Sequence, residues 1–227
     1  MHLTYLRDKS MSPLTYGGAG ISGAFSFVSN GPSKHLDYQF RHDRGTLRNA
    51  AGTTSSYMRF SFKNHTLYGE KGDEGTPFRW GWSNNNVLAS YTHSTYGNFG
   101  SRSYYFTSFG AAASYTHDFS VWGVTFRAAV VADVQLLGFT LRPSYVSGNP
   151  EGYLDPSLSG IQAFLQSVEL FVPGKAWNVG MQPQLTYTLG SGNALSLSYQ
   201  FEYSRIQHPE TVTESMGNWF LTLITAL

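Results

Sequence analysis

The sequence predicts an all-β fold, an antiparallel up-and-down barrel of about ten strands within a range of roughly eight to twelve. Three observations predict it. Apolar and polar residues alternate with a period of two in many segments, helical spacing is scarce, and the segments are separated by short runs rich in Gly, Pro, Asn, Asp and Ser. The composition does not shift along the 227 residues, so a single domain, 1–227, is expected.

The alternation is clearest in residues 195–204, LSLSYQFEYS, where large apolar side chains occupy one face of the predicted strand and Ser, Gln and Glu the other. Similar patterns, taken in order, predict strands near 14–29, 35–48, 57–69, 78–95, 104–117, 121–137, 161–172, 177–189, 194–206 and 217–227. Residues 1–13 are expected to form an N-terminal segment outside the barrel, and residues 138–160 a long connection.

Composition excludes several classes of protein. Charged residues make up 13% of the chain and aromatic residues 16%, the opposite of the balance in a disordered chain. The net charge is +1 with no long basic run, so nucleic acid is not an expected partner. Without cysteine, disulfide frameworks, thiolate metal sites and cysteine nucleophiles are excluded. No apolar run reaches the roughly 20 residues of a membrane-spanning helix.

Alternation alone does not say which face of the strands meets lipid, because a membrane barrel turns its apolar face outward and a soluble barrel turns it inward. The apolar faces here are rich in Phe, Tyr and Leu, and the polar faces carry charges of both signs at mid-strand, which favours the membrane. We therefore expect a polar network in the lumen, formed by Asp37, Arg41, Arg59, Lys63, Arg127, Asp133 and Glu202. Charges in a narrow lumen need partners, so Arg127 is expected to pair with Asp133, Glu169 or Glu202.

The tryptophans give a third indication of a membrane protein. All five fall at the start of even-numbered predicted strands, and such starts share one rim of an up-and-down barrel. Tryptophan at one membrane interface is the expected aromatic girdle. The predicted interface residues are Trp80, Trp82, Trp122, Trp177 and Trp219.

The C-terminal residues 217–227, GNWFLTLITAL, form an amphipathic strand that ends at the last residue. This resembles the terminal strand signal of small bacterial outer-membrane β-barrels, although that class usually ends in Phe and this chain ends in Leu227. The resemblance implies a location in the bacterial outer membrane, with both termini and the 138–160 connection on the periplasmic side. The opening residues, MHLTYLRDKS, show no secretory signal, so the numbering is expected to begin on a form from which the signal has been removed.

Motifs for catalysis are absent from the predicted strands. Barrel enzymes that deacylate lipids often place a Ser nucleophile two residues from a His on one strand, and no predicted strand holds the two at that spacing. No calcium loop or phosphate loop is present, so no metal or cofactor is expected.

The favoured function is therefore a non-enzymatic structural or accessory role in the outer membrane, as a subunit of a larger assembly. Its partners would be outer-membrane lipid or lipopolysaccharide and other outer-membrane or periplasmic proteins. Residues Arg142, Tyr145 and Tyr153 of the long connection are the predicted docking residues. Three alternatives remain open: a narrow pore, an enzyme that modifies lipid A or phospholipids, and a soluble β-barrel that binds a small ligand.

Overall fold

The computed structural model describes residues 1–9, 12–69, 78–93, 101–142, 168–207 and 210–225. Within these ranges the strands are β1 (His2–Asp8), β2 (Tyr16–Asn30), β3 (Lys34–Arg48), β4 (Thr54–Tyr68), β5 (Phe78–His93), β6 (Ser101–Val121), β7 (Val124–Leu141), β8 (Val168–Phe171), β9 (Ala176–Thr188), β10 (Ala194–Ile206) and β11 (Val212–Ile224). All pairings are antiparallel, and the ring of β1–β7 and β9–β11 closes through β1 and β11. The predicted all-β barrel of about ten strands is confirmed. No helix in the described ranges could cross a membrane.

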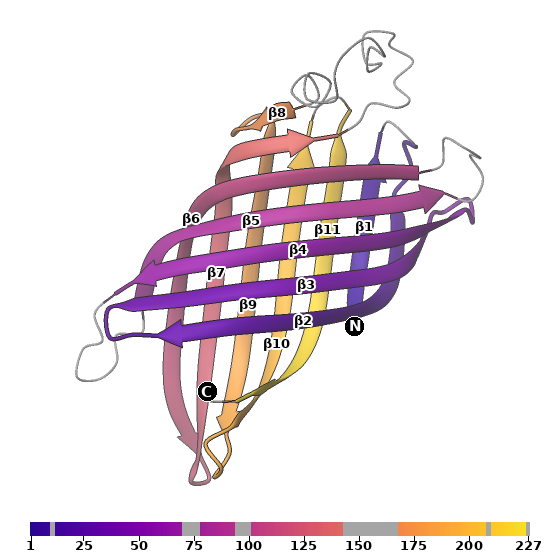
Figure 1. Cartoon of the computed structure of the whole chain (residues 1–227). Helices are drawn as coiled ribbons and strands as arrows, with labels where there is room; N and C mark the ends of the chain where they lie inside the picture. The colour runs from indigo at the N-terminus through magenta and orange to yellow at the C-terminus, as the bar shows by residue number, and fades with distance from the viewer. Residues whose placement is uncertain (10–11, 70–77, 94–100, 143–167, 208–209, 226–227) are drawn as a thin grey trace.

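The ten strands form two walls. In Figure 1, β2–β6 make the near wall and run across β7, β9–β11 and β1 of the far wall. The longest strand, β6, joins the two walls and continues into β7 through a two-residue turn. Trp122 and Gly123 in that turn have φ values of 51° and 79°, and two positive φ values are typical of the type I′ turn that suits a twisted hairpin.

The barrel has two rims, named here after a residue in a turn on each. The Asn49 rim carries the turn 49–53 and the ends of β1, β7 and β10. The Trp122 rim carries the turns 31–33, 122–123 and 189–193 and the end of β11.

The prediction that residues 1–13 lie outside the barrel is wrong. His2–Asp8 form β1, which pairs with β11 on one side and β2 on the other. The strand was hard to detect because its polarity reverses along its length. Leu3 and Tyr5 face outward and are exposed, but Leu6 is buried in the lumen and Arg7 faces out.

The strand predicted at 161–172 is also corrected. Within the predicted range, the described residues form a strand only at Val168–Phe171. This strand, β8, pairs with β7 alone and lies outside the ring. It lies along the same edge of β7 that pairs with β9 further down. The predicted strand number was therefore right because one missed strand and one miscounted strand compensate.

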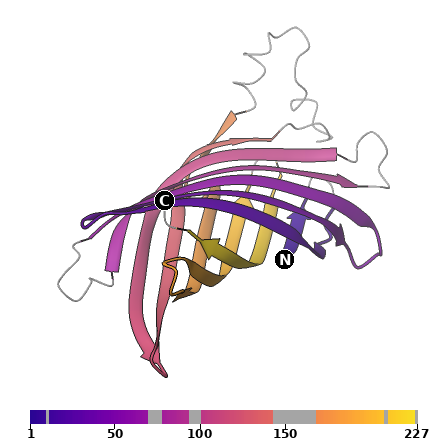
Figure 2. The ribbon, with the colours of Figure 1, turned by 60° about the horizontal axis from the view of Figure 1, so that its bottom comes forward.

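Between the N-terminal end of β1 and the Trp122 rim, the barrel is open between β2 and β11. The pairing of β1 ends where His2 lies opposite Gly20 and Asn218, and beyond that point β2 and β11 diverge (Figures 1 and 2). No pairing in the described part of the chain joins the two strands. Residues 23–30 and 221–224 are exposed on both faces of their strands. We call this opening the β2–β11 seam.

The polarity of the barrel wall changes along its axis. Over most of the height, large apolar residues such as Phe25, Leu197 and Leu221 are exposed on the outside, while polar residues are buried inside. Near the Asn49 rim the arrangement reverses. The lumen there holds an apolar cluster that includes Leu6, Leu47 and Phe171, and the outside carries Ser, Thr and Arg. We call the two outer zones the apolar belt and the polar collar.

Candidate functional site

The centre of the lumen holds a buried ionic network. Alternation along β3, β4 and β10 turns Arg41, Asp43, Arg59 and Glu202 inward, where their side chains are at most 3% exposed. Glu202 accepts from Arg41 Nη2 at 2.7 Å and from Arg59 Nη1 at 2.6 Å. Arg41 Nε also donates to Asp43 Oδ2 at 2.9 Å.

Lys63 links this group to a second one. Its Nζ lies 2.9 Å from Glu202 Oε1 and 3.1 Å from Asp133 Oδ1 of β7. His65, on the same face of β4, lies with Nε2 3.4 Å from Asp133 Oδ1 and with Nδ1 3.7 Å from Asp37 Oδ2. Six of the seven predicted lumen residues thus lie in one connected cluster.

The centre of the network is balanced in charge. Three cations (Arg41, Arg59 and Lys63) face three carboxylates (Asp43, Asp133 and Glu202), while Asp37 lies beside His65 at the edge. Burying charges is costly, and the cost is offset only when the ions are paired and hydrogen-bonded. The arrangement ties β3 and β4 of one wall to β7 and β10 of the other and fills the lumen at mid-height.

A second layer lies between this network and the Asn49 rim. The hydroxyls of Tyr57 and Tyr104 both donate to the Glu214 carboxylate of β11. Further toward the rim, Tyr91 donates to Asp8, and Arg142 Nη2 donates to both Asp8 carboxylate oxygens at 2.9 and 3.0 Å. These tyrosines are fully buried and, with the apolar cluster, close the lumen above the network.

Arg127 stands apart from the network. None of the partners expected for it, Asp133, Glu169 or Glu202, is the one observed. Its guanidinium instead donates to both carboxylate oxygens of Asp118, at 2.7 and 2.8 Å. The two residues face each other across β6 and β7 near the Trp122 rim, where the hairpin leaves its side chains more than half exposed.

The tryptophans do not share one rim, so that prediction is wrong. Trp80, Trp82 and Trp122 lie toward the Trp122 rim, Trp177 lies at the Asn49 rim, and Trp219 lies within β11 beside Tyr199. The physical reason is the predicted strand 161–172, which is not part of the ring. Because β9 follows β7 directly, β9 starts at the Asn49 rim, on the side opposite the start of β7. Trp80, Trp82, Trp122 and Trp219 are exposed on the outer surface.

The long connection leaves β7 at the Asn49 rim, opposite the end of β11, so the prediction that it shares a rim with the C-terminus is wrong. Arg142 was expected to be a docking residue, but it is buried against Asp8 and also donates to the Glu210 carbonyl. Tyr145 and Tyr153 lie outside the described residues.

Two Ser–His pairs bear on the hydrolase alternative. His2 Nδ1 lies 3.0 Å from Ser22 Oγ, but the Ser22 hydroxyl has acceptors in Asp43 at 2.6 Å and Asn218 at 2.8 Å. In a catalytic triad the histidine stands between serine and carboxylate, whereas here the serine stands between them. The second pair is Ser33, in the turn 31–33, and His35, two residues later in β3. His35 Nδ1 forms a hydrogen bond with Asn30 Oδ1 at 2.5 Å.

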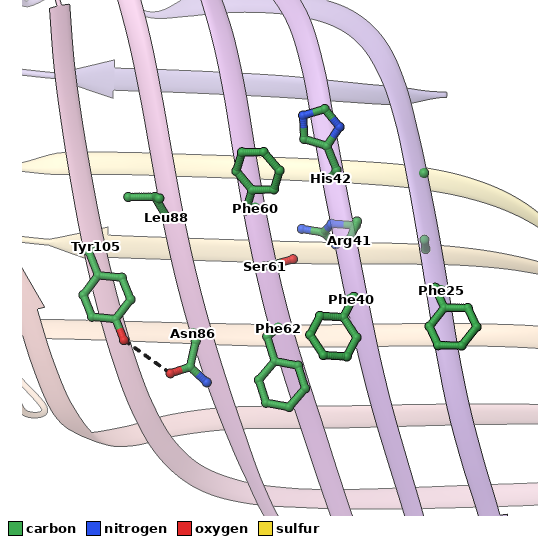
Figure 3. A pocket seen from close by; sticks show the side chains of 12 residues that line it. Phe25, Phe40, Arg41, His42, Phe60, Ser61, Phe62, Asn86, Leu88 and Tyr105 are labelled. Atoms are coloured by element: carbon green, nitrogen blue, oxygen red, sulfur yellow. Dashed lines mark hydrogen bonds between the residues drawn. The ribbon is translucent and has the colours of Figure 1, made fainter.

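The apolar belt holds a shallow groove of about 600 Å³ over β2–β6 (Figure 3). Its aromatic lining is paired, with ring centroids 4.6 Å apart for Phe40 and Phe62 and 4.5 Å apart for His42 and Phe60. Asn86 accepts from the Tyr105 hydroxyl at 3.5 Å. The groove is therefore mostly apolar.

Sequence reasoning missed several members of the lumen layers. His65 shares the inward face of β4 with the predicted Arg59 and Lys63, so the period-two pattern could have found it. Asp8 and Glu214 were missed because β1 was not recognised and β11 was expected to begin at residue 217. No family model, curated protein or solved structure matches this chain, so the site is interpreted from its own geometry.

Proposed function

We propose that the protein is an integral β-barrel of the bacterial outer membrane that does not conduct ions and has a structural or accessory role there. The observation that carries the proposal is the inverted polarity of the wall. Phe25 and Leu221 are 69% and 79% exposed on the outside, while Arg59 and Lys63 are 1% and 4% exposed inside. A soluble barrel with so large an exposed apolar surface would aggregate, whereas a bilayer covers it.

The orientation follows from the connections and from the class that the C-terminal strand resembles. Such barrels have short periplasmic turns and longer outer loops, with the C-terminus on the periplasmic side. Among the described residues, the Trp122 rim carries the end of β11 and three short turns. The strand ends that flank the connection 143–167, Leu141 of β7 and Val168 of β8, both lie toward the Asn49 rim. We therefore assign the Trp122 rim to the periplasm, and the long connection to the outside rather than to the periplasm.

The packed lumen favours a scaffold over the pore alternative. At mid-height the space is occupied by the ionic network, and toward the Asn49 rim by buried tyrosines and the apolar cluster. About ten strands enclose little more than the volume of their own side chains. Purified protein in planar bilayers should show no steps of single-channel conductance, and regular steps would favour the pore.

Insertion tests the assignment of the faces. Leu197→Arg and Phe60→Arg place a charge in the apolar belt, which should cost about 2–4 kcal/mol at the membrane midplane and reduce folding into lipid vesicles. Gln200, which is buried and donates to Gln39 at 3.1 Å, is the control, and Gln200→Ala should be better tolerated. Equal folding yields for all three variants would contradict the proposal.

A further inference from the structure

Charges on the outer surface of the strands have a single sign. Among the described strand residues, every carboxylate faces the lumen and the outward-facing charges are all basic. These basic residues are Arg7, Lys34, Arg44, Arg48 and Arg205. The four arginines lie toward the Asn49 rim, where the apolar belt meets the polar collar. Basic groups at such a boundary attract anionic lipid headgroups.

Two of the arginines share one row across the wall. Arg205 of β10 lies opposite Thr213 of β11, and Thr213 lies opposite Arg7 of β1. The Cα atoms of the two arginines are therefore two strand spacings apart, about 10 Å, with Thr213 between them. Their long flexible stems let both guanidiniums reach the space over the Thr213 hydroxyl.

Aromatic residues place this row at the level of an interface. Trp177 lies opposite Arg205 and packs against Tyr203, with ring centroids 4.8 Å apart and planes tilted by 38°. In the next row toward the apolar belt, Tyr203 and Tyr5 flank Ser215 on the same outer face. Tryptophan and tyrosine concentrate where hydrocarbon gives way to headgroups.

The two guanidiniums are also available for a ligand. Within the described ranges neither Arg7 nor Arg205 has a carboxylate within ion-pair distance, in contrast to Arg127 with Asp118 and Arg142 with Asp8. Arginine binds phosphate with paired, directional N–H donors, which makes it the preferred residue for phosphate recognition.

We propose that Arg7, Thr213 and Arg205 bind the phosphate of a lipid headgroup in the leaflet at the Asn49 rim. The guanidiniums and the Thr213 hydroxyl donate to the phosphate oxygens, and Trp177, Tyr203 and Tyr5 contact the adjoining part of the lipid. This inference rests on the proposed function, because it places the row at the membrane surface.

The test uses bisphosphorylated lipid A as the probe, added to the folded protein in a neutral detergent and followed by native mass spectrometry. Loss of charge-assisted hydrogen bonds should make the Arg7→Gln/Arg205→Gln variant retain lipid A at least about tenfold less well than the wild type. Arg127→Gln removes an exposed arginine from the lumen side and should leave retention unchanged. Equal retention by the double variant and the wild type would overturn the inference.

Two further measurements are made. One distinguishes a lipid phosphate from free phosphate, and the other distinguishes failure of the lipid site from failure of the proposed function. An excess of inorganic phosphate should displace little of the lipid A, and complete displacement would show a site for free anions instead. Folding into vesicles is measured first on all variants. Failure of the wild type to fold there contradicts the proposed function, while normal folding with unaltered lipid binding contradicts the lipid site alone.

Discussion

Glu202→Gln should destabilise the barrel more than any exposed charge change. Glu202 is 3% exposed and contacts three cations: Arg41 at 2.7 Å, Arg59 at 2.6 Å and Lys63 at 2.9 Å. Glutamine keeps the shape but removes the charge, which leaves these three cations with Asp43 and Asp133 alone. Removing one partner of a buried ion pair typically costs about 3–5 kcal/mol, because an uncompensated charge stays buried. This corresponds to a change of roughly two to three and a half powers of ten in the unfolding equilibrium.

The assay is unfolding by guanidinium chloride of protein folded in vesicles, followed by tryptophan fluorescence. The matched control is Asp118→Asn, which breaks the Arg127 pair where the side chains are 60% and 52% exposed. An exposed pair contributes about 0–1 kcal/mol, so this variant should unfold close to the wild type. Equal, small losses of stability for both variants would refute the view that the lumen network holds the two walls together.

Other predictions concern the glycines and the seam. Gly81→Ala should destabilise by about 1–3 kcal/mol, because its Cβ would lie 2.0 Å from the Thr66 carbonyl oxygen. Gly23→Ala, with nothing within 4 Å of its Cβ, should be within about 0.5 kcal/mol of the wild type in the same unfolding assay. Hydrogen exchange in detergent should be faster for the amides of residues 23–30 that point into the β2–β11 seam than for those that pair with β3. Uniform protection across β2 would show that the seam is closed.

The period-two pattern predicted the middle of the barrel well. In β3, β4 and β10 the faces differ so strongly in polarity that Arg41, Arg59 and Glu202 could be assigned to the lumen from sequence. Near the Asn49 rim the pattern failed, because the wall there is polar outside and apolar inside. β1 lies mostly in that zone. Leu6 therefore faces the lumen and Arg7 faces outward, the reverse of the arrangement in the apolar belt.

Partners across the barrel could not be predicted because they depend on strand count and register. Counting 161–172 as a strand of the ring reversed the later strands relative to the earlier ones, and this decides which rim carries Trp177. Arg127 lies on the inward face, but only the register of β6 with β7 shows that Asp118 is opposite it. Glu214 and the tyrosines that donate to it come from strands more than 100 residues apart in sequence, and no local pattern connects them.

The central claim, that the apolar belt is embedded in a bilayer, is tested most directly by fractionation of cells that express the protein, combined with gel electrophoresis of heated and unheated samples. A barrel in the outer membrane should resist extraction of the membranes with alkaline carbonate. Unheated, it should remain folded in SDS and migrate differently from the heated sample. Recovery in the soluble fraction, with no change of migration on heating, would contradict the account.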